Sequence, residues 1–286
     1  MEVERLKEEA KSFLELEKIK DEKPGSFDVV GHIAIVDFGN KTWEEKKKIA
    51  ELIMSLNKHI KTVLEKASER KGIYRIRNYN FIAGEKNTET VHKEYGCIFI
   101  LDPTKVYFSP RELTERQRIA EKVKENETVL VMFSGIAPYP IQIAKKQPNV
   151  KKIVCIEINP IAVNYARKNI RINKVENKIE IIEGDAKDIR KELIEKFDRI
   201  IMPLPLGAEN FLDVAVKYIK DGGIIHFYNW GSEPKIFENG EKIIREVLKD
   251  LEIKYKIIEK RKVLPYGPRK WKVCFDLLIK KGNSND

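Results

Sequence analysis

Short apolar runs alternate with amphipathic stretches along the second half of the chain. The apolar runs are TVLVMF (128–133), KIVCIEI (152–158), IEIIEGD (179–185), FDRIIMPLP (197–205) and GGIIHFYNW (222–230). Helical spacing of apolar residues marks 109–123, 139–146, 160–174, 187–196 and 208–219. Because parallel strands need helical crossovers, this rhythm predicts a mostly parallel sheet covered by helices on both faces. Two final apolar segments, 252–268 and 270–281, predict antiparallel edge strands.

The first third of the chain has a different pattern. Residues 1–22 are charged and helix-like, FDVVGHIAIVDF (27–38) alternates like a strand, and 40–60 has helical spacing with Asn40 or Thr42 as N-cap. Two further strands are expected within 72–84 and 96–103. The sequence therefore predicts two domains: a small α+β domain over residues 1–105, and an α/β domain over 106–286.

Composition narrows the class of protein. The 286 residues are 42% hydrophobic and 35% charged, which is typical of a globular chain. No apolar run is long enough to span a bilayer and the first residues do not form a signal peptide, so we expect a cytoplasmic protein without a membrane partner. The cysteines Cys97, Cys155 and Cys274 are too scattered for a disulfide framework or a zinc cluster. The net charge of +10 permits a nucleic acid partner, but a lysine-rich surface typical of heat-adapted proteins explains it equally well.

Candidate chemistry lies at the carboxyl ends of the predicted strands. Ligands of open α/β sheets bind at this edge, where the segments SGIAP, IEINP, EGDAKD and MPLP are expected. Glu157, after the second strand, can accept hydrogen bonds from both hydroxyls of a ribose, and Asp185, after the third, can meet the amine of an adenine. A glycine turn followed by these two acids is the order expected of an S-adenosylmethionine site. The fingerprint for NAD needs three spaced glycines, and only Gly135 is present here.

The segments VYFSPR, TER, MFSGIAPYPIQIAK, IEINPIAVNYARKNIRINKVE and MPLPLGAENFL together resemble the archaeal and eukaryotic tRNA (guanine-37-N1)-methyltransferase family over residues 70–280. This resemblance implies a class I, Rossmann-like methyltransferase domain after the small α+β domain, S-adenosyl-L-methionine as cofactor, and tRNA as substrate through its anticodon stem-loop, with tRNA-Phe expected. It also implies that the family's additional N-terminal domain is missing, and we expect a monomer.

The resemblance also implies a set of site residues. Glu115 would take the proton from guanine N1 as general base, Arg75 or Arg77 would hold guanine O6, and Pro203 stands where the family has a catalytic asparagine. The cofactor would contact Tyr107, Arg116, Phe133, Ser134, Gly135, Ile136, Ala137, Glu157, Ile158, Asn159, Gly184, Asp185, Ala186, Pro203 and Pro205. Without the resemblance, Glu115 is better explained by the dipole at a helix N-terminus, and the two arginines by the solvent face of a strand.

Three departures from the family pattern point to a subgroup. Val131 replaces an aspartate of the first strand, Ala137 replaces a glycine, and Pro203 replaces the asparagine. Proline lacks an amide donor and a side-chain acceptor, so a contact to the base is lost. These changes resemble the wyosine-pathway branch, whose members methylate C7 of 4-demethylwyosine, in some cases together with guanine N1.

Two alternatives stay open. A tRNA aminocarboxypropyl transferase of the same pathway shares the architecture and cofactor, and an inactive RNA-binding homologue is also conceivable. For an extruded base, the candidate aromatic residues are Tyr79, Phe81, Tyr107, Phe108, Trp230 and Tyr266, and the candidate phosphate ligands are Lys93, Arg111, Arg116 and Arg269. We expect no metal site, because His92 and His226 are isolated in the sequence from cysteines and acids at ligand spacing.

Overall fold

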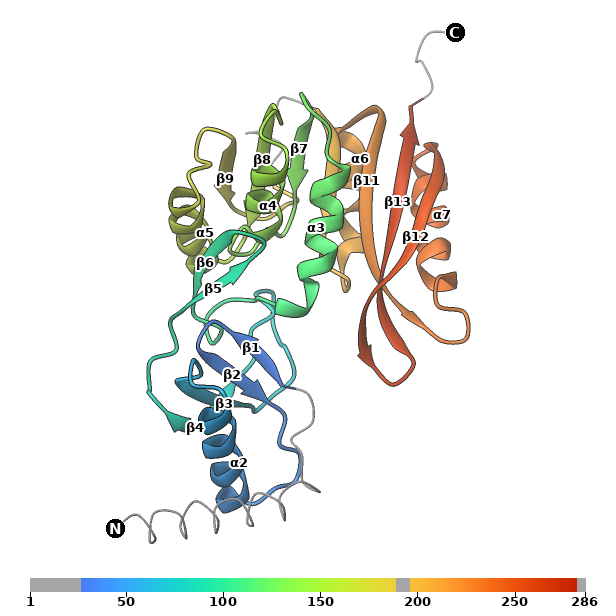
Figure 1. Cartoon of the computed structure of the whole chain (residues 1–286). Helices are drawn as coiled ribbons and strands as arrows, with labels where there is room; N and C mark the ends of the chain where they lie inside the picture. Colours follow the sequence, from blue (N-terminus) through green and yellow to red (C-terminus); the bar gives the residue numbers. More distant parts are fainter. Residues whose placement is uncertain (1–26, 189–195, 282–286) are drawn as a thin grey trace, which may run out of the picture. The chain divides into compact units, whose positions relative to one another are not determined.

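The structure is a computed structural model that describes residues 27–188 and 196–281 (Figure 1). It contains two compact units, one formed by residues up to Arg70 together with Arg77–Thr88, the other by Lys71–Ile76 together with the chain from Glu89 onward. The first boundary therefore falls near Thr88, earlier than the expected residue 105, because the hairpin at 90–101 belongs to the second unit. The helices expected over 1–22 and 187–196 lie wholly or mostly outside the described residues.

The first unit is a four-stranded sheet with one helix. The sheet has the order β1 (Asp28–Val30), β2 (Ile33–Val36), β3 (Thr62–Lys66), β4 (Tyr79–Gly84), and only β2 and β3 run parallel. Helix α2 (Trp43–Leu56) makes the crossover between these parallel strands and buries Ile49 and Ile53 in the core. Thr42 begins the helix: its hydroxyl accepts from the Glu45 amide, and the Glu45 carboxylate accepts from the Thr42 amide.

Two of the expected strands are wrong in detail. The segment 27–38 is a hairpin of β1 and β2, because Gly31 has φ +57° and reverses the chain. Within 72–84 only Tyr79–Gly84 is a strand; residues 71–76 form a turn that the Lys71 amide closes by donating to the Ile76 carbonyl at 2.9 Å. Strands β3 and β5 (Thr90–Glu94) and helix α7 (Glu238–Asp250) were not expected.

The second unit confirms the predicted α/β arrangement. Its seven-stranded sheet has the order β12-β13-β11-β10-β7-β8-β9. Its strands are β7 (Thr128–Val131), β8 (Lys152–Glu157), β9 (Ile179–Glu183), β10 (Phe197–Met202), β11 (Ile219–Ser232), β12 (Lys254–Gly267) and β13 (Lys270–Lys280). All pairs from β11 to β9 are parallel, and β12 and β13 are the antiparallel edge that the sequence predicts.

Helices cover both faces of this sheet (Figure 1). The chain runs from β7 to β9 in one direction and from β10 to β11 in the other, so right-handed crossovers put the two helix groups on opposite faces. On one face lie α3 (Leu113–Lys122), α4 (Pro138–Lys146) and α5 (Pro160–Ile172); on the other lie α6 (Leu212–Tyr218) and α7. Short 3-10 turns, η2 (Pro110–Glu112) and η4 (Ala208–Phe211), precede α3 and α6.

Two further features position the site. A hairpin of β5 and β6 (Cys97–Leu101) packs on α5. The three cysteines are free and buried. No helix in the described part of the chain is both long and apolar enough to cross a membrane.

Candidate cofactor and base site

The carboxyl ends of β10, β7, β8 and β9 lie at one edge of the sheet, as expected. Val131 of β7 pairs with Ile201 on one side and Cys155 on the other, and Glu157 of β8 pairs with Glu183 of β9. Strand order reverses between β7 and β10, because the chain moves outward on both sides of this pair. Such a switch point is where open α/β sheets bind ligands.

The turn after β7 follows an unusual backbone path. Phe133, Gly135 and Ala137 have positive φ values of +56°, +56° and +67°. Ala137 adopts the left-handed conformation directly before α4, and the Ser134 amide donates to the Ile156 carbonyl at 2.9 Å. The Ser134 hydroxyl is buried and has no hydrogen-bond partner among the described residues. A buried, unsatisfied hydroxyl is costly unless a ligand completes its bonds.

Glu157 joins this turn to the next strand. Its carboxylate is buried and accepts hydrogen bonds from the Gly135 amide at 2.7 Å and the Asn159 amide at 2.8 Å. Burial raises the pKa of Glu157, although these backbone hydrogen bonds work in the opposite direction. Asn159 in turn caps α5, where its side chain accepts from the Ile161 amide, and it donates to the Lys105 carbonyl. Ile158 between them is half-buried. Glu157 therefore fixes the backbone of the turn as well as presenting a charge.

The tip of β9 continues the same edge. Gly184 has φ +159° and its amide donates to the Glu157 carbonyl at 2.9 Å. A Cβ at Gly184 would meet no atom within 4 Å. Asp185 is half-buried and accepts from the Lys187 amide, whereas Ala186 is buried in the core. The other carboxylate oxygen of Asp185 does not take part in the hydrogen bond with Lys187.

The tip of β10 carries the two prolines. Pro203 and Pro205 are half-buried in the loop after Met202. The carbonyl of Leu206, in the same loop, accepts a hydrogen bond from the Arg75 guanidinium at 2.8 Å. Arg75 has φ +54° within the turn 71–76 that closes onto this unit. Of the two candidate arginines, the fold therefore brings Arg75 to the strand edge. Arg77 belongs to the other unit, where it lies 3.6 Å from Glu69.

Aromatic side chains flank the turn. Phe133 packs edge-on against Phe211 at 4.8 Å between ring centroids. Tyr107 is 37% exposed, and its hydroxyl donates to Glu112 at 2.8 Å. Glu112 is buried and lies 2.9 Å from the Lys272 ammonium; burial alone would raise its pKa, but the charges of Lys272 and Arg116 lower it. Ile136, in contrast, is a core residue with no exposed surface.

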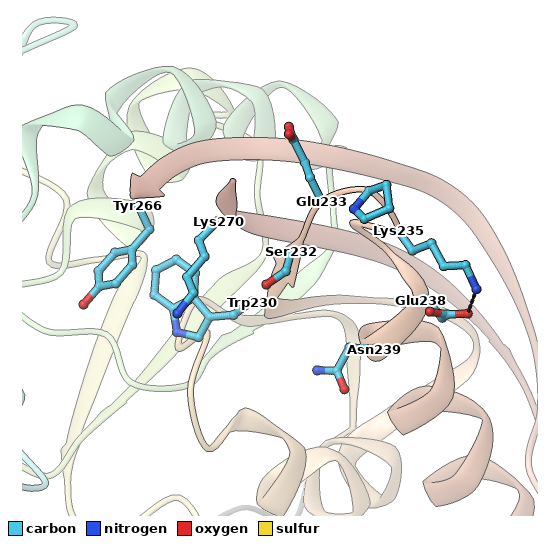
Figure 2. Close-up of a pocket in the computed structure, with 9 residues that line it drawn as sticks. Trp230, Ser232, Glu233, Lys235, Glu238, Asn239, Tyr266 and Lys270 are labelled. Atoms are coloured by element: carbon cyan, nitrogen blue, oxygen red, sulfur yellow. Dashed lines mark hydrogen bonds and ion pairs between the residues drawn. The ribbon is translucent and has the colours of Figure 1, made fainter. Parts of the chain in front are cut away.

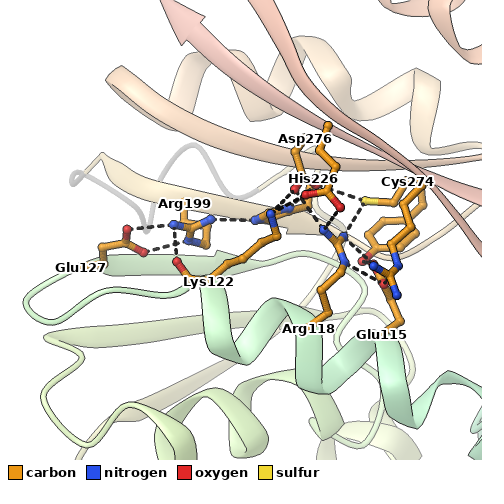
Figure 3. A network of polar contacts seen from close by, with 11 residues as sticks. Glu115, Arg118, Lys122, Glu127, Arg199, His226, Cys274 and Asp276 are labelled. Carbon is orange, nitrogen blue, oxygen red and sulfur yellow. Dashed lines mark hydrogen bonds and ion pairs between the residues drawn. The ribbon is translucent and has the colours of Figure 1, made fainter.

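Glu115 lies inside a buried network of charges (Figure 3). Its carboxylate accepts two hydrogen bonds from the Arg118 guanidinium, at 2.7 and 2.8 Å, and one from the Tyr228 hydroxyl at 2.6 Å. The network continues from Arg118 to Asp276 at 3.0 Å and from Asp276 to His226 at 2.7 Å. Glu115 is only 4% exposed, so the dipole of a solvated helix terminus does not account for it.

The Arg116 guanidinium is buried and bonded within the protein. Its guanidinium makes two hydrogen bonds of 2.7 Å to the buried Glu94 and two of 3.1 Å to the Ser109 carbonyl. Burial works against its charge, yet the contacts with Glu94 raise the pKa of Arg116. The side chain is 2% exposed. These contacts tie the β5–β6 hairpin to α3, and they contradict the expectation that Arg116 contacts a phosphate.

The aromatic candidates divide into core and surface residues. Phe108 is buried against Phe99, His92 and Arg116, so it is a core residue and the expectation of base stacking is wrong. Trp230 and Tyr266 lie 4.4 Å apart at the opening of a pocket in the second unit (Figure 2). Tyr79 and Phe81 are half-buried in the first unit, and Lys93, Arg111 and Arg269 are exposed.

The structure overturns the reason given for excluding a metal. His226, Cys274 and Asp276 are far apart in the sequence, but their ligand atoms lie within 4.8 Å of one another. Both ring nitrogens of His226 are engaged, one by Asp276 and the other by Arg199 at 2.8 Å. Burial lowers the pKa of His226. Because the Arg118 and Arg199 guanidiniums already supply positive charge to this cluster, it is better described as a hydrogen-bond network (Figure 3).

Sequence reasoning missed several residues that shape the site. Arg118, Tyr228 and Lys272 occupy positions whose periodicity indicates only a helix or strand. Apart from the contact of Arg118 with Glu115, their partners lie more than 100 residues away, as in the bond between Tyr228 and Glu115. A charged residue at a core-facing position, such as Lys272 within KWKVCFDLL, was the one available signal.

The fold and this edge define a Rossmann-like α/β protein with a switch-point site of the methyltransferase type. Residues 90–258 match the family described as the TRM5/TYW2 methyltransferase domain, and residues 6–88 match the TYW2 N-terminal domain. The chain belongs to the TRM5/TYW2 methyltransferase family, which confirms the resemblance seen in the sequence.

Similar proteins carry several names. The chain is 37% identical, over 97% of its length and 83% of the relative's, to tRNA (guanine(37)-N(1))-methyltransferase Trm5b of Pyrococcus abyssi. It is 31% identical, over 89% and 99%, to tRNA (guanine(37)-N(1))/4-demethylwyosine(37)-methyltransferase Taw22 of Nanoarchaeum equitans. It is 35% identical, over 76% and 85%, to tRNA(Phe) (4-demethylwyosine(37)-C(7)) aminocarboxypropyltransferase of Methanocaldococcus jannaschii. The crystal structure of Pyrococcus abyssi Trm5b superposes with a TM-score of 0.81 at 38% identity, covering 90% of this chain and 76% of that one.

Proposed function

We propose that this protein is an S-adenosyl-L-methionine-dependent tRNA methyltransferase that acts on the purine at position 37, at guanine N1, at C7 of 4-demethylwyosine, or at both. One observation carries the proposal. In a chain of the TRM5/TYW2 family, the buried carboxylate of Glu157 lies at the strand switch point and is bonded to the glycine turn that follows β7.

The residues at the edge fit the cofactor. Each oxygen of Glu157 accepts one backbone hydrogen bond, and a carboxylate has about four acceptor positions, so two remain for ribose hydroxyls. The Ser134 hydroxyl lacks a partner. A Cβ at Gly135 would meet only the Tyr107 carbonyl, at 3.7 Å. Space, an unsatisfied hydroxyl and a fixed acid therefore meet at one edge.

The chain's own residues would hold the cofactor in defined roles. Glu157 would bind the ribose, Asp185 the adenine amine, and the turn Phe133–Ala137 the methionine end. Tyr107, Ile158, Asn159, Gly184, Pro203 and Pro205 would line the same edge, while buried Ile136 and Ala186 would support it from behind. When bound, the cofactor supplies a sulfonium-activated methyl group for direct displacement, which needs no metal. Val131 is buried and offers no charge, so Glu157 and Asp185 would provide the acidic anchors.

The base would be bound from the side of Arg75 and Glu115. Arg75 donates to the Leu206 carbonyl, and its guanidinium has five N–H donors, so others remain for a carbonyl such as guanine O6. Glu115 would accept the N1 proton, with Arg118 and Tyr228 holding its carboxylate in one orientation. Pro203 contributes shape without a hydrogen bond, which suits a carbon target.

The aminocarboxypropyl transfer is the second candidate. It is supported by the 35% identity to a relative with that name and by Ala137, a left-handed turn position where the family resemblance implies a glycine. Both reactions use the same cofactor but transfer different carbon groups, so the mass gained by the nucleoside separates them.

The deciding experiment is nucleoside mass analysis. The full chain is incubated with labelled S-adenosylmethionine and tRNA-Phe that carries either guanosine or 4-demethylwyosine at position 37. We expect a gain of one methyl group on at least one of these. A gain of an aminocarboxypropyl group would replace the proposal by the second candidate, and tRNA binding without any transfer would favour an inactive RNA-binding homologue.

Three finer expectations belong to the same proposal. We propose tRNA-Phe as the preferred substrate, a monomeric enzyme, and a cytoplasmic location. Comparing turnover on several tRNA transcripts, light scattering of the purified chain and cell fractionation test these in turn.

A further inference from the structure

A pocket lies on the same edge of the sheet as the candidate site. β10 ends at Met202, which pairs with Phe227, whereas β11 continues to Ser232. Residues 228–232 therefore extend beyond the carboxyl ends of the parallel strands, where they pair with β13 as far as Lys270. The pocket forms at this extension and has a volume of about 540 Å³, within the range of roughly 300–1,000 Å³ that is usual for small-molecule sites.

An aromatic pair forms one wall of the pocket (Figure 2). The rings of Trp230 and Tyr266 lie 4.4 Å apart with 45° between their planes. Tyr266 is 56% exposed, and Trp230 is half-buried. Large aromatic rings at the mouth of an open pocket are unusual for a surface with only a structural role, because their apolar faces stay in contact with water. They present a flat surface on which another ring can stack.

Unpaired positive charge borders these rings. On the far side of the pocket Lys235 pairs with Glu238 at 2.7 Å, and Lys262 lies 3.8 Å from Glu233. Within residues 27–188 and 196–281, neither Arg269 nor Lys270 has an acidic partner for its side chain. Lys270, which lines the pocket with Trp230 and Tyr266, is therefore a cation without such a partner, and Arg269 precedes it in the chain. The carboxylates of the pocket, Glu233 and Glu238, each lie within 4 Å of a lysine.

The aromatic wall is also connected to the candidate site. Trp230 pairs across the strands with Lys272, and the Lys272 ammonium lies 2.9 Å from Glu112. Glu112 accepts a hydrogen bond from the hydroxyl of Tyr107, and Tyr107 lines the candidate cofactor edge. A short chain of direct contacts thus joins the two places within one compact unit.

We propose that the Trp230–Tyr266 pocket binds an unstacked nucleobase of the substrate RNA, next to the nucleotide that is modified, while Lys270 and Arg269 bind its phosphate. The inference rests on the proposed function, since it needs an RNA substrate. Stacking on aromatic side chains together with lysine or arginine at the phosphate is how proteins bind single-stranded nucleotides. A loop nucleotide is already unpaired, so placing it here breaks no base pair.

The test compares Trp230→Ala and Tyr266→Ala with the ring-preserving Trp230→Phe in the full chain. The affinity for tRNA at fixed salt, the KM for tRNA and the affinity for S-adenosylmethionine are measured for each. We expect each alanine variant to lose about 5- to 100-fold in tRNA affinity and to raise the KM for tRNA by a similar factor, with cofactor affinity unchanged. Trp230→Phe keeps most of the affinity. Tyr95→Ala, which removes another exposed tyrosine of the same unit, serves as the matched control and leaves all three values unchanged.

A second arm identifies the nucleotide. Anticodon stem-loops with a single abasic position are bound to the wild type and to Trp230→Ala. We expect one position beside nucleotide 37 of the tRNA at which removal of the base weakens binding to the wild type but not to Trp230→Ala. The reason is that both changes remove the same contact. Additive losses at every position would overturn the inference.

The outcomes separate this inference from the proposed function. If the wild type methylates tRNA and the alanine variants bind tRNA as it does, the pocket does not bind RNA and the proposed function stands. If the wild type neither binds S-adenosylmethionine nor modifies tRNA, the proposed function fails and the inference fails with it. Unchanged tRNA affinity combined with capture of a protein by the pocket would also overturn it.

Discussion

The carboxylate of Glu157 both stabilises the backbone of the protein and is expected to bind the ligand. The side chain bonds the Gly135 amide of the turn after β7 and the Asn159 amide at the start of α5. These bonds hold the carboxyl ends of β7 and β8 together. They also leave other acceptor positions of the carboxylate for a ligand. A neutral residue of the same size could keep part of this geometry but would lose the charge.

Glu157→Gln tests the charge. We expect S-adenosylmethionine affinity to fall by about 10- to 100-fold, because charge-assisted hydrogen bonds to the ribose become neutral ones and one acceptor becomes a donor. Isothermal titration calorimetry measures the change. Glu183→Gln, an exposed glutamate at the end of the next strand, is the control and should bind as the wild type does. Equal affinity of Glu157→Gln and wild type would remove Glu157 from the site.

The pH dependence of cofactor binding follows from the same residue. Burial raises the pKa of Glu157, so its proton is taken up at a higher pH than in an ordinary glutamate. Because the protonated carboxyl is a weaker acceptor, affinity should decline as pH falls, starting above the usual range near 4.3. Titration calorimetry from pH 8 to pH 5 measures it. A wild-type profile identical to that of Glu157→Gln would contradict the prediction.

Among the elements, α5 has an unusual role because its side chains complete the edge of another strand. Asn169 and Asn173 are buried and lie one helical turn apart. The side-chain oxygen of Asn169 accepts a hydrogen bond from the backbone amide of Ile100 at 2.7 Å. Its side-chain nitrogen donates to the backbone carbonyls of Ile100 and Ile136. Asn173 does the same for Ile98. The helix thereby holds the β5–β6 hairpin against the turn that follows β7.

Asn169→Ala should destabilise the fold. It leaves the Ile100 amide and two carbonyls without these partners, and each buried, unsatisfied group costs about 1–3 kcal/mol. We expect the free energy of unfolding in urea to fall by at least about 2 kcal/mol. Asn164→Ala, exposed on the same helix, should change it by less than about 0.5 kcal/mol. Similar small losses in both variants would show that water replaces the asparagine.

At the scale of the second unit, buried charges link strands that are distant in the sequence (Figure 3). Arg199 of β10 makes hydrogen bonds with Glu127 and His226. His226 is hydrogen-bonded to Asp276, which is in turn hydrogen-bonded to Arg118 of α3. Asp276 is 1% exposed, so removing one member of the network leaves charges without a partner. Burial alone would raise the pKa of Asp276, but the hydrogen bonds and charges of His226 and Arg118 lower it well below its usual value.

Asp276→Asn is therefore predicted to cost about 3–5 kcal/mol in the free energy of unfolding at neutral pH. Since the folded pKa of Asp276 lies below the unfolded value of about 3.9, its contribution is present above that pH and is lost as pH falls further. The difference between wild type and variant should accordingly shrink below about pH 4. Urea unfolding at several pH values measures this. Asp213→Asn, in an exposed pair with Lys217, is the control and should change stability by less than about 1 kcal/mol.

Much of the second unit could be predicted from sequence because its signals are local. Periods of two and 3.6 residues gave the strands from β7 to β11 and the helices α4, α5 and α6 between them, and the apolar runs marked buried strands. The weaker predictions concern places where one residue changes the chain direction. Gly31 divides one apolar segment into two strands, and the turn 71–76 interrupts another, although both segments alternate throughout.

The sequence by itself determined the sheet, its helical crossovers and the edge where Glu157 and Asp185 lie, because the carboxyl ends of parallel strands must meet at one edge. Only the tertiary structure decided the partners of the charged residues. It pairs Arg116 with Glu94 and Glu115 with Tyr228, and it brings His226 beside Cys274 and Asp276. Hydrogen bonds between such distant residues depend on strand order and register, which follow from the packing of the whole core and from no local pattern.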